Sequence, residues 1–353
     1  QWPAHIWLPG AMSAPTPASA YLHSATMVKA GIYLMARMNP ALGFTETWFW
    51  LLTIIGGITM ITGAYLGLKQ NDLKALLAYS TISQLGILMI LIGQDIPQAY
   101  KALVIGVLAH ALYKSAQWPA HIWLPGAMSA PTPASAYLHS ATMVKAGIYL
   151  MARMNPALGF TETWFWLLTI VGGITMITGA YLGLKQNDLK ALLAYSTISQ
   201  LGILMILIGQ DIPEAYKALV IGILAHALYK SALFMVAGIV DHETGTRDMR
   251  RLGGLARVMP FTFGAALLAA LSMAGLPPMF GVLAKETLLA YTTAAHPTLP
   301  SFAAELIRWS AVLAGALMLA QAGLLIRETF LGKPKDPTIE GHEAPWPMWL
   351  APA

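Results

Sequence analysis

The chain contains no cysteine, and only 10% of its 353 residues are charged. Without thiols it can form neither a disulfide nor a cysteine-ligated metal or iron–sulfur site, so we expect no redox centre and no cofactor. Soluble domains carry about 25% charged residues. The shortage of charge, together with 57% hydrophobic residues, predicts an all-α polytopic membrane protein.

The placement of the basic residues argues against nucleic-acid binding. The net charge of +5 comes from 21 Lys and Arg against 16 Asp and Glu, but the bases cluster in short loops between apolar runs. Such clustering is typical of cytoplasmic loops in membrane proteins and not of a nucleic-acid surface. If successive helices alternate in direction, the basic loops share one side, which contains Lys69, Lys74, Lys185, Lys190, Arg247, Arg250, Arg251, Arg257, Arg327, Lys333 and Lys335.

The sequence contains a direct internal repeat, because residues 1–116 recur almost unchanged as residues 117–232. The copies differ at three pairs of positions: Ile55 and Val171, Gln98 and Glu214, and Val107 and Ile223. Structural repeats of transporters usually diverge far more, and many are inverted in the membrane. This repeat therefore indicates a recent duplication or a sequence-assembly error. Both copies end in Lys-Ser-Ala, which leads into QWPAHIW after the first and LFMVAGIV after the second.

Apolar runs and helix-starting residues predict about ten membrane helices. Prolines open several of them, and the pairs Asn71-Asp72 and Asn187-Asp188 cap others. The expected ranges are 17–37, 46–68, 72–94, 98–127, 133–154, 162–184, 188–210, 214–240, 257–293 and 302–329. The helix 98–127 crosses the junction of the copies. We expect it to bend near Trp118-Pro119, because proline removes a backbone donor and clashes with the preceding turn.

Two stretches rich in proline and glycine predict broken helices. LSMAGLPPMFGVLAKETLL, residues 271–289, places four such residues at membrane depth just before Lys285 and Glu286. QWPAHIWLPGAMSAPTP, residues 117–133, is similar. Irregular backbone at this depth persists only where it lines a polar cavity or is buried in protein. The alternative is a kink that serves packing alone.

The run VIGILAHALYKSALFMVAGIV, residues 220–240, is long enough to cross a bilayer of about 30 Å. His226 and Lys230 lie four residues apart and so share one face near its middle. A lysine there costs about 2.5 to 3.5 kcal/mol on insertion scales. Either Lys230 extends to an interface, or the pair faces a hydrated interior as a proton relay, which is the interpretation that we favour.

Four motifs carry a resemblance to a known family. They are QWPAHIWLPGAMSAPTPASAYLHSATMVKAGIYLMARMNP, NDLKALLAYSTISQLGI, LAHALYKSALFMVAGIVDHETGTRD and SMAGLPPMFGVLAKETLL. In this order they resemble the antiporter-like subunits shared by respiratory complex I and the multisubunit Mrp Na⁺/H⁺ antiporters. The lysine in MVKAG, the loop HETGTRDMRRLGGL and the segment AKETLL are more similar to the large A-type (MrpA) member of the Mrp antiporters than to complex I.

The resemblance implies a complex I antiporter-like fold, with inverted five-helix units, broken helices and a central axis of lysines and histidines. Carried over to this sequence, the proton pathway consists of His139, Lys145, Lys190, His226, Lys230, Lys285 and Glu286. The first-copy equivalents are His23, Lys29, Lys74, His110 and Lys114. The resemblance also implies a multi-pass protein of the bacterial plasma membrane, other membrane subunits as partners, and H⁺ and Na⁺ as transported ions.

The chain is expected to serve as one component of a secondary transporter and not as an enzyme, since no P-loop, catalytic triad or dinucleotide fingerprint is visible. The resemblance places a further glutamate in upstream helices that this sequence does not include, so we expect a fragment with part of a pathway. Carboxylate oxygens are scarce, and a sodium site is expected elsewhere in the assembly. The alternatives are a proton-pumping subunit of complex I or a related redox complex, or a non-functional remnant.

The repeat sets the expected domain organisation. Residues 1–116 and 117–232 each form a four-helix antiporter segment, residues 233–335 form the closing helices with a broken helix, and residues 336–353 begin a truncated C-terminal region. Only the second copy continues without interruption into the closing helices. We therefore expect the second copy to occupy the native positions of these helices. The first copy then either packs outside it, which we favour because a direct repeat lacks the inverted topology, or substitutes for the missing upstream unit.

Overall fold

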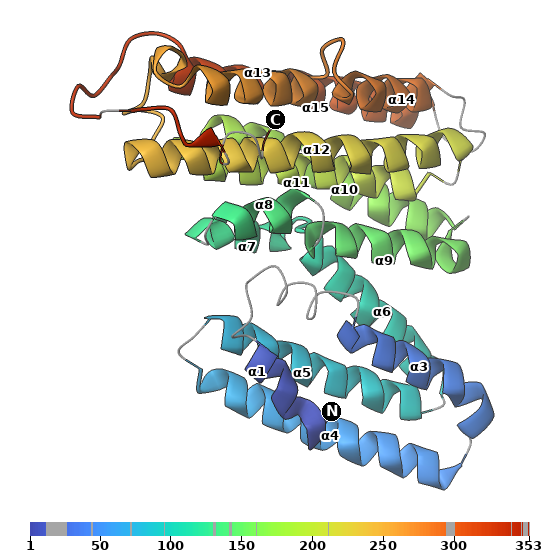
Figure 1. The fold of residues 1–353 in the computed structure, drawn as a ribbon. Helices are drawn as coiled ribbons and strands as arrows, with labels where there is room; N and C mark the ends of the chain where they lie inside the picture. The colour runs from blue at the N-terminus through green and yellow to red at the C-terminus, as the bar shows by residue number, and fades with distance from the viewer. Residues whose placement is uncertain are drawn as a thin grey trace. The chain divides into compact units, whose positions relative to one another are not determined.

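The computed structural model describes residues 1–11, 27–43, 45–70, 73–94, 96–129, 132–140, 143–159, 161–210, 212–293, 301–339, 341–346, 348 and 352. These residues are largely helical, and the only β-pairing among them is an isolated bridge between Asp188 and Asp248. The predicted all-α class is confirmed. The chain forms two compact units, Gln1–Lys114 and Ser115–Ala353 (Figure 1).

The helices of the first unit are η1 (Ala4–Ile6), α1 (Trp7–Gly10), α3 (Met27–Leu42), α4 (Glu46–Leu68), α5 (Leu73–Gly93) and α6 (Pro97–Lys114). Those of the second unit are η3 (Ala120–Ile122), α7 (Trp123–Gly126), η4 (Ala127–Ser129), α8 (Thr132–Ser140), α9 (Met143–Leu158), α10 (Glu162–Leu184), α11 (Leu189–Ile208), α12 (Pro213–Thr244), η5 (Leu255–Arg257), α13 (Pro260–Ala274), α14 (Gly281–Thr293) and α15 (Ser301–Phe330).

Five described helices are long and apolar enough to cross a membrane: Glu46–Leu68, Glu162–Leu184, Leu189–Ile208, Pro213–Thr244 and Glu305–Phe330. Two shorter apolar helices are Ala78–Gly93 and Pro260–Ala274. These helices agree with a polytopic membrane protein, while the count of about ten stays a prediction. The 32 residues of α12 correspond to about 48 Å, so one or both of its ends extend beyond a hydrocarbon core of about 30 Å.

Helix boundaries follow local sequence. The side chain of Asp188 accepts a hydrogen bond of 2.9 Å from the backbone N–H of Ala191, so its predicted role as a cap is confirmed. Its first-copy counterpart, Asp72, lies outside the described residues. Pro213 opens α12, and Gly245 closes it in the left-handed conformation with φ 68°. These residues relieve the unpaired backbone groups that every helix end leaves.

The predicted helix 98–127 is wrong, because α6 ends at Lys114 and short helical segments follow from residue 120. Ala116 adopts a positive φ of 49°, which ends the helical path. A helix through Pro119 would set its ring against the carbonyl one turn earlier, and a residue that precedes proline disfavours the helical region. The chain therefore leaves the helix before Trp118-Pro119 instead of bending there.

The helix predicted over 257–293 is interrupted, as its glycines and prolines indicated. α13 ends at Ala274, Gly275 follows with φ 71°, and α14 begins at Gly281. A Cβ at Gly281 would overlap the carbonyl oxygen of Ser272, so only glycine fits this crossing. Over the predicted helix 133–154 the structure describes α8 and α9, and residues 141–142 between them are outside the described part.

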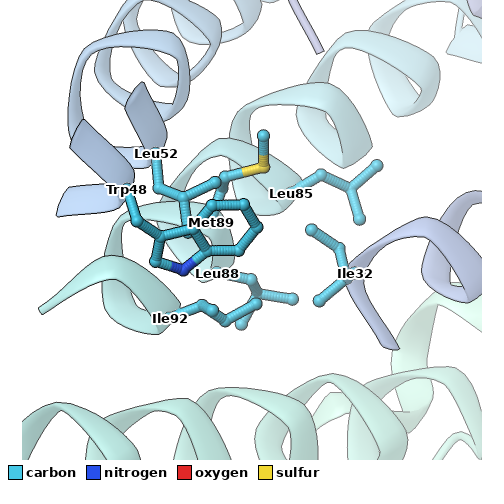
Figure 2. Packing of buried hydrophobic residues seen from close by; sticks show 7 residues of the cluster. All are labelled: Ile32, Trp48, Leu52, Leu85, Leu88, Met89 and Ile92. Atoms are coloured by element: carbon cyan, nitrogen blue, oxygen red, sulfur yellow. The ribbon is translucent and has the colours of Figure 1, made fainter. Parts of the chain in front are cut away.

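In the first unit, α3, α4 and α5 enclose an apolar cluster. Figure 2 shows its buried members, which are Ile32, Trp48, Leu52, Leu85, Leu88, Met89 and Ile92. The indole N–H of Trp48 donates to the side-chain oxygen of Asn39 at 2.6 Å, so the polar edge of the ring is satisfied inside the apolar cluster. The second copy repeats this hydrogen bond between Trp164 and Asn155.

In the second unit, α12 packs against α8 and α11 on one side and against α13 and α14 on the other (Figure 1). α15 packs on α10, where the side-chain amide of Gln321 donates to the carbonyl of Ala180 at 2.6 Å. The closing helices thus complete a bundle around the second copy. α12, which carries His226 and Lys230, lies inside that bundle.

Glu343, in the C-terminal segment, caps the start of α13. Its carboxylate accepts hydrogen bonds from the backbone N–H of Phe261 at 2.8 Å and from the hydroxyl of Thr262 at 2.5 Å. A carboxylate at a helix N-terminus satisfies free N–H groups and favours the helix dipole. The neighbouring His342 places a ring nitrogen 2.9 Å from the carboxylate of Glu243, near the end of α12. The C-terminal segment therefore joins α12 to the broken helix α13–α14 at this end.

A second contact attaches the C-terminal segment to the loop after α12. Asp336 forms an ion pair of 2.7 Å with Arg251, and the side chain of Thr338 donates to it at 2.6 Å. The hydrogen bond from Thr338, followed by that from Arg251, lowers the pKa of Asp336 to about 2. Asp336 is therefore a carboxylate at neutral pH, and the ion pair with Arg251 is charged on both sides.

Replacing Gly202 by Ala should destabilise the second unit by about 1 to 3 kcal/mol. α10 and α11 cross so closely that a Cβ at Gly202 would overlap the backbone nitrogen of Met176. Thermal unfolding of the purified chain in detergent measures the loss. Gly173→Ala is the matched control, because no atom lies within 4 Å of the added carbon. Equal melting of the two variants would contradict this account of the crossing.

Candidate functional site

The second unit buries an unusual number of basic side chains. His139, His226 and Lys230 have no exposed surface, and Lys190 and Lys145 expose 2% and 6%. They come from α8, α9, α11 and α12. Among these helices, α12 packs against α8 and α11, and α11 packs against α9. Burying basic groups in an apolar bundle costs free energy, so such groups mark candidate functional sites. We call His139, Lys145, His226 and Lys230 the buried basic cluster.

Lys230 extends from α12 to α11. Its ammonium donates to the carbonyl of Leu193 at 2.9 Å and to the hydroxyl of Ser196. Both acceptors are neutral, and no ion pair to Lys230 occurs among the described residues. The alternative that Lys230 extends to a membrane interface does not hold in this unit, because the side chain is fully buried.

Lys145 connects three helices. Its ammonium donates to the carbonyl of Ser140, the last residue of α8, and to the carbonyl of Ile223 on α12 at 3.0 Å. Ile223 lies three residues before His226, so this contact places a second ammonium beside the histidine.

The two histidines of the cluster make few hydrogen bonds to the protein. Neither ring nitrogen of His139 has a hydrogen-bond partner among the described residues, and its ring lies 4.7 Å from that of Phe234. The nitrogens of His226 make no hydrogen bond of normal geometry, although the carbonyl of Ser140 lies nearby. Buried polar atoms are almost always satisfied, so water is the partner that such rings require.

Lys190 differs from Lys145, Lys230 and Lys285 because it has a carboxylate partner. Its ammonium lies 3.9 Å from Asp241 on α12, and Arg247 forms an ion pair of 3.1 Å with Asp188 beside it. The side chain of Asp241 is about one-third exposed, so this group of charges connects the bundle interior to the loop side. Lys190 is therefore at one end of the site.

Lys285 lies at the break between α13 and α14. Its ammonium donates to the carbonyl of Ala274, which the end of α13 frees from helical bonding. A cavity of about 260 Å³ adjoins it. The polar members of the cavity lining are Gln200, Tyr229, Ser272 and Lys285, and most of the others are apolar. Glu286, predicted with Lys285, is instead exposed on α14.

The first-copy candidates cannot be compared in the same way. His23 lies outside the described residues. Lys29, Lys74, His110 and Lys114 lie in α3, α5 and α6, but their side chains are also outside the described part. Their predicted roles stay predictions.

Sequence reasoning missed three neighbours of the predicted residues. Ser196 is signalled by the polar run Ser-Thr-Ile-Ser inside the apolar helix α11. Asp241 follows Lys230 by 11 residues, about three helical turns, and so lies on a similar face. Tyr229 lies between His226 and Lys230 in the sequence, but no sequence pattern signals that its ring packs edge-on against His226 with centroids 5.5 Å apart.

The site suits the movement of protons better than the binding of a metal. Among the residues described, no group of three or more His, Asp or Glu side chains could hold a metal ion. The buried basic cluster instead combines two ammonium groups with two imidazoles that lack strong protein partners. Imidazole can both accept and donate a proton near neutral pH.

One known protein family matches most of the chain, and it does so twice. The transmembrane family described as NADH:quinone oxidoreductase/Mrp antiporter matches residues 1–115 and again residues 111–308. The first match covers the first copy of the repeat, and the second match covers the second copy and continues to residue 308.

Individual relatives carry the names of antiporter components. The A-type component of a Na⁺/H⁺ antiporter of Alkalihalophilus pseudofirmus is 41% identical over 86% of this chain, and the A/B-type component of a probable K⁺/H⁺ antiporter of Rhizobium meliloti is 47% identical over 71%. This chain covers 39% and 25% of their lengths. The solved Mrp complex of Dietzia sp. DQ12-45-1b matches 99% of this chain at 33% identity with a TM-score of 0.65, and 37% of that structure's chain is covered.

A cysteine at position 285 should react with a small water-soluble thiol reagent in native membranes. The cavity at the helix break gives this side chain access to water, and the chain has no other cysteine to react. Ala194→Cys is the matched control, because Ala194 is fully buried and does not line the cavity. Protection of position 285 equal to that of position 194 would show that the cavity is dry.

Proposed function

Because the chain belongs to the NADH:quinone oxidoreductase/Mrp antiporter transmembrane family, we propose that it is part of the proton-translocating subunit of a multisubunit Na⁺/H⁺ antiporter. In this proposal, protons move along the buried lysines and histidines of the second unit in exchange for a monovalent cation. The names of the relatives support the antiporter class and do not favour the complex I alternative.

The observation that carries the proposal is the environment of Lys230. Its ammonium is fully buried and donates to two neutral oxygens, and no carboxylate pairs with it among the described residues. Ionisable side chains inside a membrane bundle are rare and mark proton and ion paths. Lys230 is therefore the side chain on which the proposed relay depends.

The proposed path runs along α12. From the loop side it passes Lys190 and Asp241, then Lys230 with His139 and His226, then Lys145. It ends on the far side of α12, at Lys285 and its cavity. Water is expected between these groups, since the histidine nitrogens lack strong protein partners. Each step moves one proton between neutral and cationic forms of a side chain or of water, and no cofactor is needed.

The remaining features of the proposal come from the relatives. The chain would work in a multi-pass arrangement of about ten helices with other membrane subunits as partners, in the plasma membrane of a bacterium. The exchanged cation is Na⁺ in the name of one relative and K⁺ in that of another. Its binding site is proposed to lie outside the buried basic cluster, since the cluster offers nitrogen donors and few of the oxygen ligands that alkali cations take.

Lys230→Ala, in the full-length protein assembled with its partner subunits, should lower cation/H⁺ exchange in vesicles by about tenfold or more. The reason is that the variant removes the proton-carrying ammonium from the centre of the path. ΔpH-driven exchange with Na⁺ and with K⁺ measures the rate. Membrane insertion and complex assembly should be unchanged, because alanine is well tolerated in an apolar helix.

Lys185→Ala is the matched control. Lys185 ends α10 at the loop side, where its ammonium lies 4.6 Å from the ring of Tyr181 and outside the buried basic cluster. This variant should keep the wild-type rate. Exchange at half the wild-type rate or more in Lys230→Ala would contradict the relay role of Lys230.

A further inference from the structure

Two polar regions of the second unit lie on different sides of α12. One is the buried basic cluster, which faces α8, α9 and α11. The other is the cavity at Lys285, which lies among α11 to α15. No hydrogen bond between described protein atoms joins Lys285 to the cluster. A pathway that includes both regions needs a group that belongs to each of them.

Tyr229 is placed to be that group. It directly precedes Lys230, and its ring packs edge-on against His226 with an angle of 72° between the rings. The same residue lines the cavity that Lys285 adjoins, although only 6% of it is exposed. Tyr229 thus contacts a member of the buried basic cluster and also forms part of the cavity wall.

The chemistry of a phenol suits this position. A phenol has one O–H donor and can accept a hydrogen bond on the same oxygen. It can therefore receive a proton from one neighbour while it releases its own proton to the next, and it remains neutral after the transfer. Among the polar groups of the lining, Tyr229 is the one that belongs to α12 and packs its ring against His226, whereas Ser272 and Gln200 come from α13 and α11.

We propose that Tyr229 is a relay residue that passes protons between the buried basic cluster and the cavity at Lys285. This inference rests on the proposed antiporter function. A proton that leaves water in the cavity binds the phenolic oxygen as the phenolic proton moves to water or imidazole on the cluster side, and rotation of the hydroxyl restores the starting state. Charge and proton number on Tyr229 are unchanged after each cycle.

The competing explanation is that the ring of Tyr229 serves only as an apolar wall. Phenylalanine would then be an equivalent residue, because it keeps the ring, the edge-on contact with His226 and the shape of the cavity. Tyr229→Phe removes only the hydroxyl and so separates the two explanations. The matched control is Tyr181→Phe, since Tyr181 is half exposed on α10 and lies outside the cavity lining.

The experiment uses the complete antiporter assembly in vesicles and measures ΔpH-driven exchange in H₂O and in D₂O. Tyr229→Phe should lower the rate by about tenfold and enlarge the solvent isotope effect, because proton transfer becomes the slow step. Tyr229→His should recover part of the rate, since imidazole also carries protons. Tyr181→Phe should match the wild type. The melting temperature of the Tyr229→Phe assembly should stay unchanged.

Three outcomes would overturn the proposal. A wild-type rate and isotope effect in Tyr229→Phe, while Lys230→Ala has lost exchange, would make Tyr229 a wall and leave the proposed function intact. A Tyr229→His variant that is assembled but as slow as Tyr229→Phe would also exclude a relay. Absence of exchange in the wild-type assembly would instead reject the antiporter function and the relay together.

Discussion

A buried ammonium must be surrounded by acceptors, and this requirement explains much of how the second unit is built. Its bundle supplies neutral oxygens where carboxylates are missing. Lys285 binds the carbonyl of Ala274 at the end of α13. Lys145 binds the carbonyls of Ser140 and Ile223. Lys230 uses a carbonyl and a hydroxyl of α11, so all these acceptors are neutral oxygens of neighbouring helices.

The sequence predicted most helices of the second unit and the break before Lys285, because glycine, proline and apolar run length act locally. The prediction was wrong at the junction of the copies, where we expected the helix to bend near Trp118-Pro119 but it ends at Lys114. It also missed Tyr229 and Asp241. Their roles depend on which helices pack beside them, and the apolar residues of a membrane helix do not distinguish one face from another.

Burial shows why some predicted site residues belong together and others do not. His139, Lys145, His226 and Lys230 belong together because side chains of α8, α9 and α12 reach across to α12 or α11, as the contacts His139–Phe234, Lys145–Ile223 and Lys230–Leu193 show. Lys285 and Glu286 are adjacent in sequence, yet the helix turn directs one to the cavity and leaves the other exposed. A sequence motif can therefore mark a candidate region, but it does not show which of its charged side chains is buried.

The end of α6 at Lys114 makes the backbones of the two copies electrically different in spite of their matching sequence. Lys114 is the last residue of its helix, whereas α12 continues for 14 residues beyond Lys230 to Thr244. The aligned peptide dipoles of a helix sum to a partial negative charge of about half an electron at its C-terminus, and they offset one another in mid-helix. The backbone therefore creates a negative potential at the end of α6 that α12 lacks at Lys230. Duplication of the sequence has thus not duplicated the electric field in which its lysines are placed.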